Sequence, residues 1–245
     1  MSQYPRFLPL GDRALCVELG DSISEATNRR VHSLSREIAK LGARGVLEVV
    51  PTYRSLVVYY DPLSISHADL VSRIGELDGT LEEGEAVAPR LVEIPTLYGG
   101  EYGPDIGDVA GHNGISEAEV IEIHSGTDYP VYMMGFLPGF PYLGGMSEKI
   151  ATPRLKTPRS TIPAGSVAIA DRQTGIYPVE SPGGWRLIGR TPISLFDPTR
   201  EPPVAIEPGD YLRFVQVDES QYADIQSSVR SGTYTPVTRQ RGEPK

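Results

Sequence analysis

Apolar residues near the N-terminus recur first at every second position and then at every third or fourth. The alternation over residues 14–19 predicts a strand with one buried face. The wider spacing that follows, up to residue 41, predicts an amphipathic helix. Ser22 and Glu25 have the spacing of a capping box at the start of this helix, and Gly42 predicts its end.

Two further strands and a second helix are expected before the pattern changes. Residues 46–50 and 56–60 are rich in β-branched and aromatic side chains and predict a hairpin. Apolar residues at helical spacing over residues 70–77 predict the second helix, and residues 91–94 predict a final strand. The order βαββα predicts a ferredoxin-like α+β domain.

Residues 78–89 interrupt this pattern with acidic residues, glycines and a proline. We place a domain boundary in this segment, which gives an N-terminal α/β domain over residues 1–88 and a second domain over residues 89–218. The alternative is a long loop inside one domain. We consider it less favourable because the pattern of elements also changes here.

Two short helices, residues 105–113 and 117–125, are predicted next. Their spacing would suit a DNA-binding helix–turn–helix. The second helix, however, carries three glutamates, which DNA phosphates would repel. We therefore expect a structural helix pair.

The stretch from residue 129 to residue 198 is punctuated by glycine and proline every few residues, with short apolar runs between them. This pattern predicts short strands joined by turns, as in an antiparallel barrel or sandwich. Residues 204–206 and 211–217 are expected to add closing strands. Residues 219–245 are expected to form a polar C-terminal tail with a weak helical pattern.

The net charge of −9 and the sequence pI near 5.0 disfavour attraction to nucleic acid or to anionic membranes. We recognise neither a signal peptide nor an apolar run of ~20 residues that would span a bilayer. The single cysteine, Cys16, fits a reducing compartment. We therefore expect a cytoplasmic protein with no nucleic-acid or membrane partner.

Familiar catalytic motifs are missing from the sequence. It contains neither a glycine-rich phosphate loop nor a GxSxG nucleophile motif. The four histidines and one cysteine do not cluster, so we assign no metal site and no catalytic residue. His124 lies near the end of a predicted helix, where interaction with the helix dipole is its expected role.

Positive charge is the main chemical feature of the stretch 129–198. The stretch holds seven basic and four acidic residues, a local charge of +3. Arginine binds carboxylate or phosphate through two parallel hydrogen bonds, and glycine-rich turns can add backbone N–H groups. Any single arginine is more often paired within the protein, but the group favours a site for a small anion.

Uncharged residues of the same stretch complete the candidate site. Trp185 can stack on a ligand ring, although a lone tryptophan is more often part of the core. The candidates for orienting an anion are Ser166, Gln173, Thr174, Tyr177 and Ser181. The residues expected to shape the loops are Pro138, Gly139, Phe140, Gly165, Gly175, Pro182, Gly183, Gly184 and Trp185.

Three blocks of this stretch resemble one bacterial family in sequence, order and spacing. They are residues 135–144 (GFLPGFPYLG), 158–166 (PRSTIPAGS) and 173–185 (QTGIYPVESPGGW). The chain resembles the family that holds the B-type subunit of 5-oxoprolinase, the sporulation kinase A inhibitor and the first subunit of allophanate hydrolase. The resemblance covers residues 5–217.

The resemblance implies an α/β domain followed by a mainly antiparallel, cyclophilin-like β-barrel. It also implies one subunit of an ATP-dependent enzyme that cleaves 5-oxo-L-proline to L-glutamate and is inactive without partners of the A and C types. ATP and Mg²⁺ would serve the complex, and water would open a phosphorylated lactam. On this interpretation Arg154, Arg159 and Arg190 clamp anionic groups.

Two other functions stay open within the same family. The kinase inhibitor binds a histidine kinase, and only partner context would distinguish that role. Half of a biotin-dependent carboxyltransferase, as in urea amidolyase, would again need a partner chain. We rank the 5-oxoprolinase assignment first because so loop-rich a site exceeds what a docking surface needs.

Overall fold

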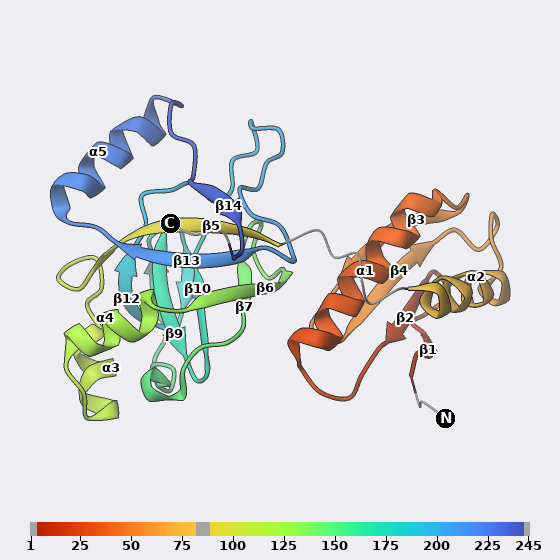
Figure 1. Cartoon of the computed structure of the whole chain (residues 1–245), viewed down its shortest axis with the longest axis horizontal. Helices are drawn as coiled ribbons and strands as arrows, with labels where there is room; N and C mark the ends of the chain where they lie inside the picture. The colour runs from red at the N-terminus through yellow and green to blue at the C-terminus, as the bar shows by residue number, and fades with distance from the viewer. Residues whose placement is uncertain (1–3, 82–88, 243–245) are drawn as a thin grey trace. The chain divides into compact units, whose positions relative to one another are not determined.

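The computed structural model describes residues 4–81 and 89–242 and divides into two compact units, Met1–Val87 and Ala88–Lys245 (Figure 1). We call them the N-terminal unit and the C-terminal unit and describe each by itself. Most of the segment expected to contain the domain boundary, residues 82–88, lies outside the described residues.

The N-terminal unit is a four-stranded sheet with two helices. The strand order is β1-β2-β4-β3, and each neighbouring pair is antiparallel. The predicted hairpin and both predicted helices are present. The elements are β1 (Arg6–Pro9), β2 (Ala14–Glu18), α1 (Glu25–Leu41), β3 (Val46–Pro51), β4 (Ser55–Tyr60) and α2 (His67–Thr80).

Alternating strand residues determine which face of this sheet is buried. Leu15 and Val17 of β2 and Leu56 and Val58 of β4 are fully buried, and they pack in one cluster with Leu34 of α1. Burying such a side chain contributes about 1.5–3 kcal/mol relative to leaving it exposed. The period of two in the strands and the period near 3.6 in the helix therefore build one shared core.

The start of α1 differs from the prediction. Ser24, and not Ser22, is the N-cap, because the Ser24 side chain accepts a hydrogen bond from the Thr27 backbone N–H at 3.1 Å. The helix ends at Gly42 as predicted. That residue has φ 54°, a left-handed conformation that glycine adopts without strain.

The ferredoxin-like assignment of the N-terminal unit is not confirmed. The elements from β2 to α2 follow the predicted order βαββα, but the outer place beside β2 is occupied by β1, which precedes them in the chain. Residues 91–94 do not form a last strand of this unit. They lie within β5 (Arg90–Tyr98) of the C-terminal unit.

The C-terminal unit is built on an eight-stranded sheet that nearly closes into a barrel (Figure 1). Its path is β10-β9-β12-β5-β13-β6-β7, with β14 also paired to β5, and the two end strands, β7 and β10, contact each other. The β5–β13 pair is parallel, and the other pairs are antiparallel.

Beside the barrel, β8 and β11 form a two-stranded antiparallel sheet. The strands are β6 (Asp128–Met134), β7 (Pro141–Leu143), β8 (Arg159–Ile162), β9 (Ser166–Ala170), β10 (Gln173–Ile176), β11 (Ser181–Gly183), β12 (Arg186–Arg190), β13 (Tyr211–Gln216) and β14 (Thr238–Gln240). The helices are α3 (Ile106–Asn113), α4 (Glu117–Ser125), α5 (Glu219–Arg230) and the short η1 (Glu148–Ile150).

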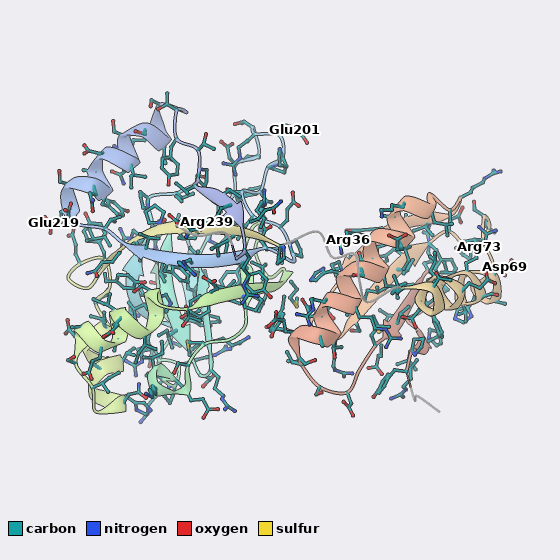
Figure 2. All side chains as sticks on the ribbon, in the orientation of Figure 1. Arg36, Asp69, Arg73, Glu201, Glu219 and Arg239 are labelled. Carbon is teal, nitrogen blue, oxygen red and sulfur yellow. The ribbon has the colours of Figure 1, made fainter. Side chains whose placement is uncertain are left out.

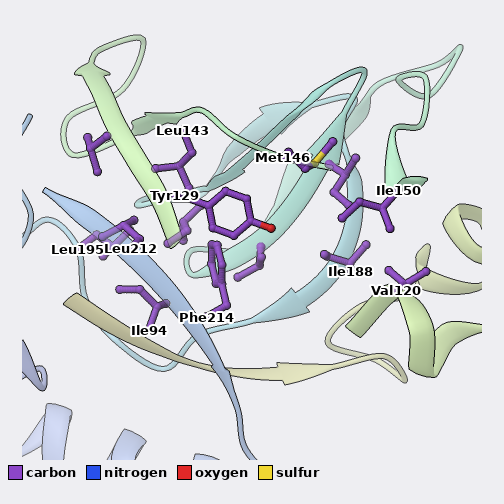
Figure 3. Packing of buried hydrophobic residues seen from close by; sticks show 14 of the residues in the cluster. Ile94, Val120, Tyr129, Leu143, Met146, Ile150, Ile188, Leu195, Leu212 and Phe214 are labelled. Atoms are coloured by element: carbon purple, nitrogen blue, oxygen red, sulfur yellow. The ribbon is translucent and has the colours of Figure 1, made fainter. Parts of the chain in front are cut away.

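Large apolar side chains fill the barrel interior (Figure 3). The rings of Tyr129 and Phe214 lie with their centroids 5.5 Å apart, in one cluster with Ile94, Leu143 and Leu212. These residues come from β5, β6, β7 and β13. Contacts between distant segments, and not one local segment, therefore hold the sheet in its curved form.

Helices α3 and α4 are the predicted helix pair. Ser116 and Glu119 form the predicted capping box at the start of α4. Val109 of α3 and Val120 of α4 are fully buried in the barrel cluster. The pair therefore has the structural role that its charge pattern indicated.

Residues 219–242 are more structured than the polar tail that the sequence predicted. Helix α5 begins at Glu219, and β14 extends the sheet at β5 (Figure 2). Arg239 of β14 donates a hydrogen bond to Glu93 of β5 at 2.6 Å. Side-chain pairing across the two strands thus adds to the backbone ladder.

Of the two predicted closing strands, one is present. Residues 211–217 correspond to β13, which lies between β5 and β6. Residues 204–206 do not form a strand and contribute a single bridge between Val204 and Phe196.

Candidate functional site

Arg159 of β8 binds a buried carboxylate of its own chain. Its guanidinium donates hydrogen bonds of 2.9 and 2.7 Å to the two oxygens of Asp105. Asp105 is 5% exposed and also accepts a hydrogen bond from the Leu187 backbone N–H at 2.7 Å. Arg159 therefore joins β8 to the start of α3 and is not free for a ligand.

Arg154 lies at the surface. Its Nε is 3.4 Å from a carboxylate oxygen of Asp171, and its guanidinium lies 5.8 Å from the ring centroid of Trp185. The side chain is 57% exposed, so this ion pair contributes little. Two further arginines of the stretch are also paired, Arg172 with Glu148 and Arg186 with Asp108.

Arg190, at the end of β12, differs from these four arginines. Within residues 4–81 and 89–242 its guanidinium has neither a hydrogen bond nor an ion pair, and its Nε is buried. It lies 5.4 Å from the ring centroid of Tyr102, a cation–π contact that holds it in place. A fixed positive group without a counter-ion is suited to binding a ligand anion.

A pocket of about 250 Å³ opens beside Arg190. Its walls come from the turn before β9, from β12 and the segment after it, and from α5. The guanidinium is the one formally charged group among the described residues that line it. The lining residues are Ala164, Gly165, Pro178, Arg190, Thr191, Pro192, Ile193, Ser194, Tyr222 and Gln226.

Gly165 allows the wall of this pocket to form. It has φ 80°, and a Cβ at this position would lie 2.3 Å from the Thr191 carbonyl oxygen. The Thr191 backbone N–H donates to the Gly165 carbonyl at 2.9 Å. A side chain at residue 165 would therefore displace the segment that follows Arg190.

Two of the predicted polar residues are used inside the barrel. The Ser166 hydroxyl donates to the Pro163 carbonyl at 2.7 Å, and the Thr174 hydroxyl donates to the Ala168 carbonyl at 3.1 Å. Both residues are fully buried. Their hydroxyls stabilise the strands and do not reach the Arg190 pocket.

The other polar candidates also lie away from this pocket. Gln173 is half-buried at the start of β10. Tyr177 is 2% exposed and packs against Phe140 with ring centroids 5.6 Å apart. Ser181 is buried, and its hydroxyl has no hydrogen-bond partner in the described part of the chain. The structure thus places Arg190 and Gly165 in one pocket wall, while none of the remaining polar candidates lines the pocket.

Several of the predicted loop-shaping residues surround an aromatic cluster. Phe140 and Trp185 are buried with ring centroids 5.7 Å apart. A Cβ on Gly175 would lie 3.2 Å from Trp185 and 3.3 Å from Phe140, and one on Gly183 would lie 2.4 Å from the Tyr177 hydroxyl. These glycines make room for the rings, and Trp185 lies in the core.

Of the remaining loop-shaping residues, Pro138 and Pro182 are exposed. Gly139, which follows Pro138, has φ 79° and approaches Pro178, a residue of the pocket wall. Pro182 is in β11, and the Gly184 carbonyl accepts a hydrogen bond from the Leu155 backbone N–H at 2.7 Å.

His124 has a role that its position near a helix end did not predict. The ring is fully buried, with Nδ1 2.8 Å from the Tyr98 hydroxyl and Nε2 2.8 Å from the Thr174 hydroxyl. Because Thr174 gives its one proton to the Ala168 carbonyl, Nε2 must donate and Nδ1 must accept from Tyr98. Burial lowers the pKa of His124 to about 3, so the ring is neutral.

Three residues that build the pocket region lie outside the stretch 129–198. Tyr102 packs against Tyr222 with ring centroids 5.0 Å apart, and Gln226 lines the pocket. The spacing of Tyr222 and Gln226, four residues apart on a helix, was the only local sign that they share a face. The helical pattern did not indicate what that face covers.

Neither a metal cluster nor a membrane-spanning helix is found among the described residues. Residues 4–81 and 89–242 contain no group of three His, Cys, Asp or Glu side chains that could hold a metal ion. Across the same ranges, every helix is too short or too polar to cross a bilayer.

The chain is similar to bacterial proteins that carry the name of the B-type subunit of 5-oxoprolinase. The protein from Bacillus subtilis is 44% identical over 87% of this chain and 93% of its own length. The one from Escherichia coli O157:H7 is 42% identical over 89% of this chain and 98% of its own length. Urea amidolyase from Saccharomyces cerevisiae is more distant, with 23% identity, and this chain covers 14% of it.

Solved structures and a family model agree with these similarities. TTHA0988 is 37% identical with a TM-score of 0.76, and the match covers 84% of this chain and 40% of that longer chain. PH0987 from Pyrococcus horikoshii, described as a conserved uncharacterized protein, is 51% identical over 89% of this chain and all of its own, with a TM-score of 0.54. The model for the carboxyltransferase domain, subdomain C and D, matches residues 5–206. The chain therefore belongs to the carboxyltransferase-domain family that includes the B-type subunit of 5-oxoprolinase.

Proposed function

We propose that this chain is the B-type subunit of a bacterial 5-oxoprolinase that cleaves 5-oxo-L-proline to L-glutamate with hydrolysis of ATP. The support is identity of 39–44% to three proteins of that name, with more than nine-tenths of each covered. Subunits of the A and C types would complete the enzyme. A cytoplasmic location and a cyclophilin-like form of the barrel are part of the same proposal.

The observation that carries the site assignment is the unpaired guanidinium of Arg190 in its pocket. The substrate is a carboxylate at neutral pH, and a guanidinium can bind it through two charge-assisted hydrogen bonds. The Tyr102 ring fixes the guanidinium beforehand, which reduces the entropy lost on binding.

The pocket fits a small acid better than a nucleotide. Pockets for drug-sized ligands usually measure about 300–1,000 Å³, and this one, at about 250 Å³, is below that range. We therefore assign ATP, with its Mg²⁺, to another part of the assembled enzyme. The described lining residues include no carboxylate or imidazole for proton transfer, which is consistent with a subunit that is inactive alone.

Replacing Arg190 by glutamine tests this assignment. The Arg190→Gln variant, mixed with subunits of the A and C types, should show a KM for 5-oxo-L-proline raised about 10-fold or more, because a charge-assisted hydrogen bond contributes about 1.5–3 kcal/mol. The measurement is the initial rate of glutamate formation against substrate concentration.

Arg154→Gln is the matched control, since it removes an arginine from the same stretch that is exposed and weakly paired. Its KM should stay within about twofold of the unmodified value. Equal effects of the two substitutions would remove the Arg190 assignment. Absence of glutamate formation in every mixture of folded, associating subunits would contradict the enzyme itself.

A further inference from the structure

Helix α5 lies beyond the part of the chain that the family model matches, yet it forms one wall of the Arg190 pocket. The match ends at residue 206, and α5 spans Glu219–Arg230. Tyr222 and Gln226 of α5 line the pocket. They are four residues apart, so they lie one turn apart on the same helix face.

Tyr222 fixes this helix against the barrel. It is the one residue of α5 that is buried, at 5% exposure. Its ring packs against Tyr102, whose face carries the Arg190 guanidinium. Burial raises the pKa of Tyr222 and the neighbouring charge of Arg190 lowers it, so the two side chains are electrostatically close. The position of α5 over Arg190 is therefore set by a continuous contact through the two tyrosines.

Gln226, which carries a side-chain amide, lines the same pocket. Its side chain is partly buried and makes no hydrogen bond within the described residues. A primary amide offers both a donor and an acceptor in one plane. A cyclic amide offers the complementary pair, because its N–H and C=O lie on the same side of the ring.

We propose that Gln226 is a specificity-determining residue that pairs with the lactam amide of the substrate while Arg190 binds its carboxylate. The Gln226 side-chain NH₂ donates to the lactam carbonyl, and the side-chain carbonyl accepts from the lactam N–H. This inference rests on the proposed function and extends it, since it names a binding residue outside the matched family region. It selects small carboxylic acids that carry a ring amide over acids of the same shape without one.

The size of the pocket agrees with such a ligand. At ~30 Å³ per molecule, a volume near 250 Å³ corresponds to about eight waters. A five-membered lactam with one carboxylate fills a space of that order. A site that hydrogen-bonds a substrate group rejects analogues without that group more strongly than an apolar pocket does. An analogue that lacks the amide leaves the Gln226 groups unpaired.

The test compares the substrate with cyclopentanecarboxylate, which keeps the ring and the carboxylate but lacks the amide. The full chain is assembled with subunits of the A and C types, and two constants are measured, the KM for 5-oxo-L-proline and the inhibition constant of cyclopentanecarboxylate. For Gln226→Met, which keeps the length of the side chain, we expect the KM to rise about tenfold. The inhibition constant should not rise and should fall, because the analogue leaves the Gln226 amide unpaired and methionine removes that penalty.

Two further variants make the result specific. Ser227→Ala, an exposed position on the same helix, should leave both constants unchanged. Gln226→Glu should raise both constants, because the new carboxylate competes for the Arg190 guanidinium. Thermal unfolding of each variant checks that α5 remains folded.

The outcomes separate this inference from the function on which it rests. An active complex in which Gln226→Met leaves the KM unchanged, or shifts both constants equally, overturns the role of Gln226 and leaves the proposed enzyme intact. A complex of unmodified chains that forms no glutamate overturns the proposed function and this inference with it.

Discussion

At the scale of single residues, His124 is notable because a group that normally titrates near neutral pH is fully enclosed by the barrel. Both ring nitrogens have hydroxyl partners, from Tyr98 and Thr174, and the ring packs 4.3 Å from the centroid of Phe214. A protonated ring would lose the hydrogen bond that Nδ1 accepts and would place a charge in an apolar site. The neutral form is therefore part of the native packing.

The stability of the protein should fall as the pH falls from neutral. The pKa of His124 is about 3 in the folded chain against an ordinary 6.5, so between these values the unfolded state binds one more proton. The free energy of unfolding should drop by about 2 kcal/mol from pH 7 to pH 5. Urea unfolding at the two pH values measures this difference.

The matching variants are His124→Phe and His112→Gln. Phenylalanine at position 124 should lower the stability at both pH values, because the Tyr98 hydroxyl loses its acceptor, but it should remove most of the pH dependence. His112 is exposed, and its replacement should leave the pH dependence as it is. An unchanged slope in His124→Phe would show that other groups cause the effect.

At the scale of elements, the first helix shows how closely a cap must be placed. Ser22 and Ser24 are both suitable residue types, but only the Ser24 hydroxyl reaches the free N–H of Thr27. The capping-box spacing of Ser22 and Glu25 was therefore misleading, while the real box at Ser116 was recognised. Nearby serines compete for one cap, and the backbone path into the helix decides between them.

Two single substitutions distinguish these serines. Ser24→Ala should lower the free energy of unfolding by about 1 kcal/mol, because one N-terminal N–H loses its acceptor. Ser22→Ala should change it by less than about 0.5 kcal/mol, as for other exposed positions. Chemical denaturation of both variants gives the comparison, and a larger loss for Ser22→Ala would contradict the observed cap.

At the scale of the whole molecule, the two units have separate hydrophobic cores. Leu34 belongs to the cluster of the N-terminal unit and Leu212 to that of the C-terminal unit, and both are fully buried. Each unit therefore contains the apolar contacts needed to fold by itself.

Reciprocal core substitutions test this separation. Leu34→Ala should cost about 2–5 kcal/mol and reduce hydrogen-exchange protection in residues 4–81, with little effect on residues 89–242. Leu212→Ala should have the reverse effect. Loss of protection in both units from either substitution would mean that they unfold as one cooperative body.

Much of this architecture was predictable because local period and turn chemistry act over a few residues. The periods of the N-terminal unit predicted α1, α2 and the β3–β4 hairpin, and the glycine and proline punctuation predicted short strands in an antiparallel barrel or sandwich. The place of residues 91–94 was not predictable in the same way. Their alternation suits any sheet, and pairing with β13, which follows much later in the chain, decides that they belong to the barrel.

The sequence predicted the chemistry of the candidate site, a group of arginines suited to an anion, but not its geometry. Five arginines in one stretch indicated an anion site, yet four of them have partners in the folded chain. Arg159 is neutralised by Asp105, a residue 54 positions earlier, while the Arg190 guanidinium lies over the ring of Tyr102 and has no ion pair within the described residues. An ion pair forms wherever folding brings opposite charges within about 4 Å, and sequence spacing does not report that distance.

The sequence by itself determined the helices α1 to α4, the β3–β4 hairpin and, through its three glycine- and proline-rich blocks, the family. These properties depend on neighbours along the chain. Only the tertiary structure decided that Arg190 is the one arginine of residues 129–198 without a hydrogen bond or ion pair, that α5 lines its pocket and that His124 is enclosed and neutral. Those properties depend on partners that lie far apart in the sequence and meet only when the barrel closes.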